Sequence, residues 1–208
     1  MGPAVDVWLA DLDVPASEES RMWLLLDQAE QERAQQFRLD RLRRRYTVAH
    51  AMVRLLLGDR VQADPRVLRF ETGEHGKPFL AGGAGLAGDP PHFNLSHSGE
   101  RALVAIRDDG PVGVDIEQVR ELSSLRGVAE RILAPALLAA FEEAADPTVF
   151  VLDQWTRKEA VLKAGGEGIT RPLREVDGSG CVALDVGEGY VGALAGPGRF
   201  EVVLKRWP

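Results

Sequence analysis

The stretch Trp155-Thr-Arg-Lys-Glu-Ala-Val-Leu-Lys163 decides the fold of the second half of the chain. Its apolar residues at near-helical spacing, followed by Gly165-Gly166, predict a helix that ends at these glycines. Residues four apart share a helix face, so Glu159 places its carboxylate beside the ammonium of Lys163. Because such a pair is most often an exposed ion pair, the helix alone identifies no site.

A second pair of carboxylates lies upstream, in Val112-Gly-Val-Asp-Ile-Glu117. This segment predicts a strand, on which Asp115 and Glu117 point to the same side. A solvated strand edge is the simpler interpretation of the pair. If the strand and the helix converge, three carboxylates and a lysine surround one point, and this set suits Mg²⁺ and a phosphate.

Two further segments carry groups that suit an anion. The first, His92-Phe-Asn-Leu-Ser-His-Ser-Gly99, predicts a short strand that runs into a turn of small residues. That turn offers backbone N–H groups and an imidazole. The second, Gly76-Lys77-Pro78, predicts a turn that presents one cation.

Taken together and in this order, the four segments resemble the motifs of the 4′-phosphopantetheinyl transferases. The resemblance covers most of the chain and is closest to the monomeric type that activates carrier domains of non-ribosomal peptide and polyketide synthetases. It implies a fold of the α+β class, with two similar halves that form a pseudo-dimer and an active site in the cleft between them. The sequence itself shows no internal repeat, so the duplication is implied by the resemblance.

The expected halves are residues 1–111 and 112–208. The N-terminal half is expected to contact the phosphates and adenine of coenzyme A, and the C-terminal half to carry the Mg²⁺ ligands and the catalytic helix. The implied reaction transfers the phosphopantetheine arm of coenzyme A to a serine of an acyl or peptidyl carrier protein, with release of adenosine 3′,5′-bisphosphate.

The resemblance assigns the metal and catalytic roles to four residues. Asp115, Glu117 and Glu159 are expected to hold Mg²⁺, and Lys163 to neutralise charge that develops on the diphosphate. Glu159 is also the best candidate for the base that accepts the serine proton. One residue does not readily serve both as a tight ligand and as a free base, and the sequence leaves the two roles of Glu159 open.

The expected contacts with coenzyme A come from the first half. Arg45 falls where the family places an arginine on the 3′-phosphate, and Arg33 falls where an upstream basic residue assists. Glu30 departs from the pattern, because another cation is expected near this position. The remaining expected contacts are Lys77 at the 3′-phosphate end, Pro78 in a turn against adenine, and Ser96 and His97 at the phosphates.

The net charge of −7 conceals a basic segment. Residues 31–60 hold eight arginines against three acidic residues, a local charge of +5 in an acidic protein. Such a block suits a polyanion, and Arg41-Leu-Arg-Arg-Arg45 in principle suits nucleic acid. However, no nucleic-acid recognition motif accompanies it, and a solvated helix face is the simpler explanation for most of these arginines. We therefore expect no nucleic-acid partner.

Composition agrees with a compact soluble enzyme located in the cytoplasm, and the resemblance implies a monomer. With 208 residues, 45% hydrophobic and 27% charged, the chain is an ordinary globular protein. The lone Cys181 excludes an intramolecular disulfide and favours a reducing compartment. Neither a secretory signal nor an apolar run of membrane-spanning length is visible, so no membrane association is expected.

Other chemistries find little support in the sequence. The four histidines lack the spacing of a zinc site, and no phosphate-binding loop of the nucleotide triphosphatases is present. Ser96 and His97 are adjacent in an extended segment and point apart, which disfavours a nucleophile–base pair. The alternative to the transferase is a non-catalytic module that binds coenzyme A or carrier proteins, disfavoured because all four predicted catalytic and metal residues are present.

The hydrophobic pattern also predicts the elements that frame these motifs. Strands are expected near residues 4–10, 67–70, 93–96, 102–107 and 112–117, and an antiparallel meander near 182–186, 192–194 and 200–205. Helices are expected over 30–58, 125–145 with an interruption at Pro135, and 149–164.

Overall fold

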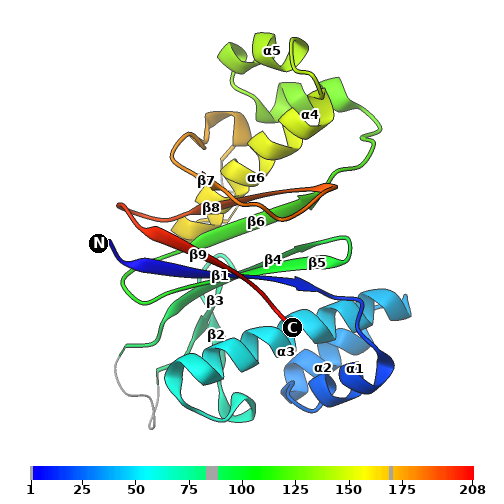
Figure 1. Ribbon diagram of the computed structural model, residues 1–208, viewed down its shortest axis with the longest axis vertical. Coiled ribbons are helices and arrows are strands. Elements are labelled where there is room, and N and C mark those ends of the chain that lie inside the picture. Colours follow the sequence, from blue (N-terminus) through cyan, green and yellow to red (C-terminus); the bar gives the residue numbers. More distant parts are fainter. Residues whose placement is uncertain (1, 83–88, 169–170) are drawn as a thin grey trace.

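The computed structural model of the chain describes residues 2–82, 89–168 and 171–208. Two β-sheets lie face to face at the centre, and helices cover the outer face of each sheet (Figure 1). This layered α+β arrangement is the fold class that the sequence predicted. A separate hairpin of β2 (Phe70–Thr72) and β3 (Pro78–Leu80) carries the Gly76 turn.

The first sheet has the strand order β4-β5-β1-β9. It combines β1 (Ala4–Asp11), β4 (His92–Ser98), β5 (Arg101–Arg107) and β9 (Glu201–Arg206). The pairs β4–β5 and β5–β1 are antiparallel, whereas β9 runs parallel to β1. Its outer face is covered by α3 (Asp40–Val61), with α1 (Ala16–Trp23) and α2 (Gln28–Gln35) packed against α3 (Figure 1).

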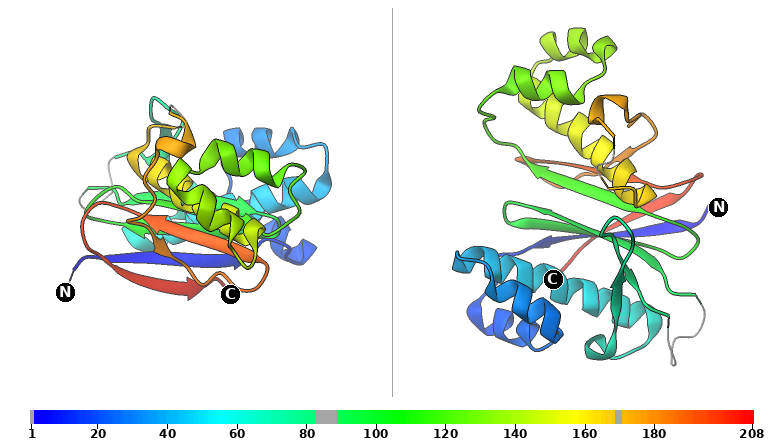
Figure 2. Two further views of the ribbon diagram at one scale, coloured as in Figure 1. Left: turned by 90° about the horizontal axis from the view of Figure 1, so that it is seen from above. Right: turned by 180° about the vertical axis from the view of Figure 1, so that it is seen from behind.

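The second sheet is antiparallel, with the order β6-β8-β7. It consists of β6 (Gly113–Gln118), β7 (Val182–Ala183) and β8 (Tyr190–Ala195). The motif helix α6 (Pro147–Gly165) crosses its outer face, and α4 (Leu125–Ile132) and α5 (Pro135–Glu142) pack at the far end of α6 (Figure 2). The helix predicted over 149–164 is therefore confirmed as α6. The helix predicted over 125–145 is interrupted before Pro135, as expected, and forms α4 and α5.

Strand alternation builds the core between the sheets. Every second residue of β1 and of β6 points into this layer, because successive side chains of a strand face opposite ways. Its members are buried aliphatic residues from both sheets, among them Val5, Val7, Leu9, Leu103, Val112, Val114, Ile116 and Leu194. The same alternation directs Asp115 and Glu117 out of this core, toward the edge where β6 meets β4.

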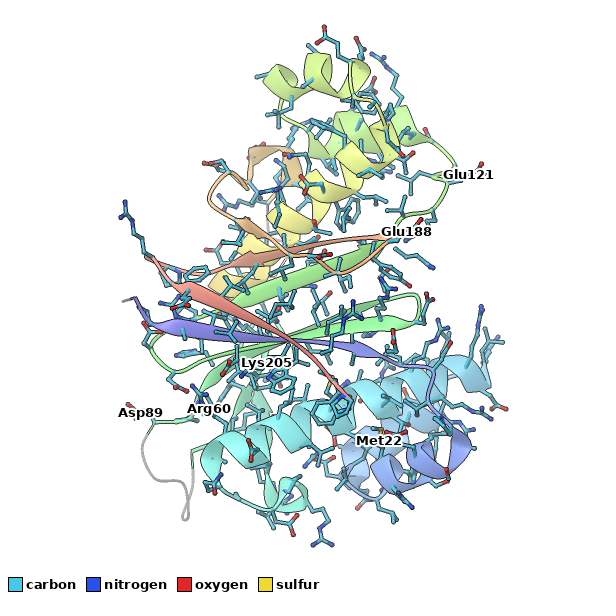
Figure 3. The ribbon with its side chains drawn as sticks, viewed as in Figure 1. Met22, Arg60, Asp89, Glu121, Glu188 and Lys205 are labelled. Carbon is cyan, nitrogen blue, oxygen red and sulfur yellow. The ribbon has the colours of Figure 1, made fainter. Side chains whose placement is uncertain are left out.

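A second core fixes the helices of the first half. Met52 and Leu57 of α3 pack against Val104 and Ile106 on the outer face of the first sheet. Nearby, Met22 of α1, labelled in Figure 3, belongs to one buried cluster with the α3 residue Val48. Since α3 carries Arg45, this packing positions the basic segment relative to β4.

Two expectations about strands were wrong. The strand expected near 67–70 begins only at Phe70, as β2, because residues 65–67 form a 3-10 helix, η1 (Pro65–Val67). The Asp64 side chain accepts from the backbone N–H of Arg66, and proline stands at the first helical position. The predicted closing meander is limited to β7 and β8. The last strand, β9, instead lies in the first sheet beside β1. The second expected half therefore contributes one strand to the sheet of the first half.

The approach of α6 to β6 is closest at Gly113. A Cβ atom at this position would overlap with the Ala160 carbonyl oxygen and the Ala164 backbone nitrogen. Glycine is therefore required at this crossing so that the helix backbone can rest directly on the strand. This contact sets the distance between the strand that carries Asp115 and the helix that carries Glu159 and Lys163.

We expect Gly113→Ala to destabilise the protein by about 3 kcal/mol, because added atoms in a closely packed crossing force the backbone to shift. Denaturant unfolding measures this loss. Gly180→Ala is the matched control, because a Cβ atom at Gly180 meets nothing within 4 Å. Its expected effect stays within about 0.5 kcal/mol. Equal losses for both variants would contradict the close approach.

Candidate active site

The edges of the two sheets are joined by side chains from alternate residues of β4. Asn94 Oδ1 accepts from the backbone N–H of Val114 at 2.8 Å, and the Ser96 hydroxyl donates to Asp115 Oδ1 at 2.7 Å. The Ser98 hydroxyl donates to Glu117 Oε2 at 2.8 Å. The two predicted carboxylates of β6 are therefore each held by a serine of the first half.

Asp115 is the centre of a buried polar cluster. The residue is only 4% exposed, and Lys163 Nζ lies 2.6 Å from Oδ1. The same ammonium donates to Ser96 Oγ at 3.0 Å. Asp115 Oδ2, in contrast, is buried without a hydrogen-bond partner among the described residues. A buried, unpaired carboxylate oxygen costs stability, and such atoms often mark a functional group.

Burial opposes the charged forms of two carboxylates at this site. It raises the pKa of Asp115, although the neighbouring Lys163 ammonium and the Ser96 hydroxyl partly offset the increase. Burial also raises the pKa of Glu159, and the negative charge of Asp115 raises it further. The charge of Glu117 likewise raises the pKa of Asp115, and a bound cation would relieve this repulsion among the three carboxylates.

The other two predicted carboxylates come from different elements, Glu117 from β6 and Glu159 from α6. Glu117 accepts from Ser98 and also from Arg120, whose Nη1 lies 3.1 Å from Oε2. Glu159 is partly buried and lines a cavity of about 460 Å³ between α6, α4 and η2 (Leu173–Glu175). The other residues that line it are Arg131, Ile132, Trp155, Pro172, Leu173 and Arg174.

The predicted metal ligands are neighbours, but they do not form a gathered site. Across residues 2–82, 89–168 and 171–208, no group of three His, Cys, Asp or Glu side chains is arranged to hold a metal ion. Lys163 is instead the counter-ion of Asp115. The donor set still fits Mg²⁺, because it consists of carboxylate oxygens and includes the buried, unpaired Oδ2 of Asp115.

His97 lies on the opposite face of β4 from Ser96, as strand alternation requires. It lines a cavity of about 300 Å³ together with residues of α3, which include Arg41, Arg45 and Tyr46. The imidazole is accessible to solvent but surrounded by protein, and desolvation lowers the pKa of His97. The predicted separation of Ser96 and His97 is confirmed, and the imidazole is grouped with two arginines.

Arg45 is held in place by two groups. Its guanidinium pairs with both carboxylate oxygens of Asp13, at 2.8 and 2.7 Å, and donates to the Gly99 carbonyl oxygen at 2.6 Å. The Asp13 carboxylate raises the pKa of Arg45, so the cation is permanent. Each terminal nitrogen of a guanidinium carries two N–H groups, so Arg45 keeps donors for an anion in the cavity.

Arg33 stands outside this cavity. It is exposed on α2, where it donates to Gln36 Oε1 at 2.8 Å and lies over the Phe37 ring at 5.6 Å. Phe37 lines the cavity, so Arg33 is close to its rim. Glu30, which replaces the expected cation, pairs with the fully buried Arg54 and completes a capping box at the start of α2.

Lys77 does not line the cavity of Arg41 and Arg45, and it contacts α6 instead. Its ammonium donates to the carbonyl oxygens of Val112, Lys163 and Ala164, at 3.0, 2.6 and 3.2 Å. A lysine has three N–H donors, so these contacts use all of them. They argue against the expected contact of Lys77 with the 3′-phosphate. Its neighbour Pro78 lines a separate cavity of about 330 Å³.

Several residues of these clusters escaped the sequence reasoning. Asn94 and Ser98 act with Ser96, and their alternate spacing on a predicted strand was the available signal. The role of Asp13 had no signal, because it lies 32 residues from its partner Arg45. Phe93 is buried at 3% exposure, and Trp155 packs against the core cluster of α4 and α6 while it lines the cavity next to Glu159.

Comparison with known proteins gives two family matches that together span most of the chain. Residues 111–200 match the model of the 4′-phosphopantetheinyl transferase superfamily. Residues 14–108 match the N-terminal model of 4′-phosphopantetheinyl transferase.

Curated relatives agree with these matches. The transferase HetI of Nostoc sp. is 34% identical over 176 residues, which cover 83% of this chain and 73% of HetI. The transferase Sfp of Bacillus subtilis is 29% identical over 170 residues, which cover 78% of this chain and 70% of Sfp. A putative transferase of Synechocystis sp. is 30% identical over 178 residues, covering 85% of this chain and 70% of that relative. The chain belongs to the 4′-phosphopantetheinyl transferase superfamily.

Membership establishes the activity. The protein is a transferase that moves the phosphopantetheine group of coenzyme A to carrier proteins. The resemblance stated from the four motifs is thus confirmed, and the non-catalytic alternative loses its basis. None of the described helices has the length and hydropathy needed to cross a membrane.

Proposed function

We propose that the transfer requires Mg²⁺ and that Asp115, Glu117 and Glu159 provide the ligands of the ion. The observation that carries this proposal is the unpaired, buried Oδ2 of Asp115 next to two further carboxylates. When bound, the ion would neutralise charge on the diphosphate of coenzyme A. The predicted cytoplasmic location remains a prediction.

Lys163 is proposed to bind the diphosphate while it remains paired with Asp115. Two of its three N–H donors contact Asp115 and Ser96. The third is free to donate to a phosphate oxygen, at least with respect to the described residues. Ser96 is proposed to orient this ammonium, and Glu159 to accept the proton of the carrier serine or to serve as a ligand.

The cavity between α3 and β4 is proposed to receive the 3′-phosphate of coenzyme A. Arg45 and His97 line it, and Arg41 adds a second guanidinium there. Arg33, near the rim, is proposed to attract the negatively charged coenzyme A over a longer range. We further propose that Pro78 contacts the adenine ring through the separate cavity that it lines.

Removal of the Arg45 guanidinium tests the phosphate assignment. We expect Arg45→Ala to weaken the binding of coenzyme A by about 10- to 150-fold, because one charge-assisted hydrogen bond contributes roughly 1.5–3 kcal/mol. The variant should bind 3′-dephospho-coenzyme A almost as tightly as the wild type does. Isothermal titration measures both affinities.

Arg44→Ala is the control for this prediction. Arg44 is a neighbouring arginine of α3 with a half-exposed side chain, and it pairs with Glu19 at 3.4 Å. Its replacement should leave both affinities unchanged. Equal losses for the two ligands in Arg45→Ala would mean that Arg45 acts through the Gly99 turn and not through the phosphate.

The carrier is proposed to be a domain of a peptide or polyketide synthetase, and the enzyme a monomer. A monomer is supported because Ser96 of the first half and Asp115 and Lys163 of the second form one cluster within a single chain. Mass spectrometry of a panel of apo-carrier domains, incubated with coenzyme A and either Mg²⁺ or a chelator, tests the proposed carrier class and the proposed requirement for Mg²⁺. Modification of fatty-acid carriers alone, or modification in the chelator, would contradict them.

A further inference from the structure

We infer that Lys77 is a positioning residue that aligns the catalytic helix α6 with the metal-binding strand β6, and that its ammonium does not hold the 3′-phosphate of coenzyme A. Lys77 belongs to the hairpin of β2 and β3 in the first half of the chain. Its three acceptors all belong to the second half, at the start of β6 and at the end of α6. The inference rests on the proposed role of Lys163.

The contacts with α6 complete the end of that helix. The last carbonyl groups of a helix lack partners within the helix, and its C-terminus carries partial negative charge. Lys77 donates to the carbonyl oxygens of Lys163 and Ala164, the last residues before Gly165. One of these carbonyl groups belongs to the residue whose ammonium contacts Asp115. The main chain of Lys163 is therefore fixed by Lys77 and its side chain by Asp115.

The third contact ties the same ammonium to β6. Val112, whose carbonyl oxygen accepts from Lys77 at 3.0 Å, directly precedes Gly113 and lies three residues before Asp115. Gly113 is the point where the backbone of α6 rests on β6. Lys77 thus joins the two backbones next to their crossing, and it limits sliding of Lys163 relative to Asp115.

The surroundings of Lys77 favour this role over phosphate binding. Burial lowers the pKa of Lys77, which reflects removal of its ammonium from water. Its stem also lies close to Gly166, where an added Cβ atom would stand 3.5 Å from Lys77 Cδ. The proposed 3′-phosphate cavity is lined mainly by α3 residues and His97, and Lys77 is not among its lining residues. Lys77 lines the cavity of Pro78 instead.

A double-mutant cycle with Lys163 tests the inference. Lys77→Met keeps a side chain of similar length but removes the three N–H donors. We expect it to lower kcat by up to about 10²-fold, as small misplacements of reacting groups do, with little change in KM for coenzyme A. In the Lys163→Ala background, the same substitution should lower kcat by less than about twofold, because residues that act through one another are not additive.

Two other variants separate this role from simple stabilisation. Lys77→Arg keeps the charge and the donors and should restore most of kcat. Lys205→Met is the control, because Lys205 pairs with Asp6 on the α3 side of the first sheet, away from α6 (Figure 3). It should leave kcat unchanged. All rates are compared well below each variant's melting temperature, and Lys77→Gln replaces Lys77→Met in the cycle if the latter does not fold.

Three results would overturn the inference. Multiplicative losses in the double variant would mean that Lys77 acts independently of Lys163. An unchanged kcat with a lower melting temperature would reduce Lys77 to a structural role. A selective loss of affinity for coenzyme A over 3′-dephospho-coenzyme A would restore Lys77 as a phosphate ligand. A large but measurable loss of kcat in Lys163→Ala is expected in any case, and full activity of that variant would refute the proposed function instead.

Discussion

Asp115→Asn is expected to slow modification of the carrier at least about 10³-fold while the protein remains folded. The substitution removes the charge that binds Lys163 and, by our proposal, Mg²⁺. Electrostatic stabilisation at such a site contributes several kcal/mol, and each 1.36 kcal/mol corresponds to a tenfold change in rate. Mass spectrometry of the carrier under single-turnover conditions measures the loss.

The stability of Asp115→Asn, in contrast to its rate, should not fall below that of the wild type. Burial raises the pKa of Asp115 in the folded protein, which means that folding disfavours its charged form. Above the folded pKa the ionised carboxylate therefore costs stability, and this cost is absent below the unfolded pKa. At pH 7 the melting temperature of Asp115→Asn without Mg²⁺ should thus equal or exceed that of the wild type.

Metal-dependent stabilisation provides the control for this prediction. Mg²⁺ with coenzyme A should raise the melting temperature of the wild type and have little effect on Asp115→Asn. Asp185→Asn, an exposed change in the same half, should leave rate and stability unaltered. A rate for Asp115→Asn close to that of the wild type would exclude Asp115 from the site.

The parts of the fold that the sequence predicted well are governed by local interactions. The helix α6 follows from its apolar spacing and the glycines that end it, and the directions of Asp115 and Glu117 follow from the alternation of a strand. The opposite directions of Ser96 and His97 follow for the same reason. These predictions need only the identity of the element.

The errors arise where the partner of a segment is distant in the chain. β9 has the pattern of an antiparallel strand, but its pattern does not say which sheet it joins, and it pairs in parallel with β1 at the other end of the sequence. Similarly, a turn that presents a cation was predicted at Lys77, but its acceptors lie 35 to 87 residues away. Tertiary packing decides such contacts, and one sequence carries no signal of them.

The resemblance to a family indicated which residues belong to the site, but it said little about the groups that those residues contact. It selected Asp115 and Lys163, which the structure brings to 2.6 Å of one another. It also marked Glu30 as a departure, without indicating that this carboxylate neutralises the buried Arg54. A motif states which groups are present, whereas the unpaired Oδ2 of Asp115 becomes visible only when every hydrogen bond around it is known.

Replacement of Glu159 by glutamine separates the two roles that remain for this residue. Turnover is expected to fall by roughly 10²–10⁴, the contribution of a positioned acid–base group. Glutamine keeps the shape of the side chain in its cavity beside Trp155, so coenzyme A should still bind. The informative measurement is the rate as a function of Mg²⁺ concentration.

We expect excess Mg²⁺ to restore part of the rate of Glu159→Gln, which indicates a ligand. The reason is electrostatic: burial and the charge of Asp115 both raise the pKa of Glu159, and a divalent cation relieves this repulsion better than a single proton does. A loss that Mg²⁺ does not alter would instead assign Glu159 as the base, which a raised pKa also favours. Glu167→Gln, an exposed change just beyond α6, is the matched control and should behave as the wild type. Full turnover of Glu159→Gln at low Mg²⁺ would exclude both roles, and the serine proton would then have to leave to water.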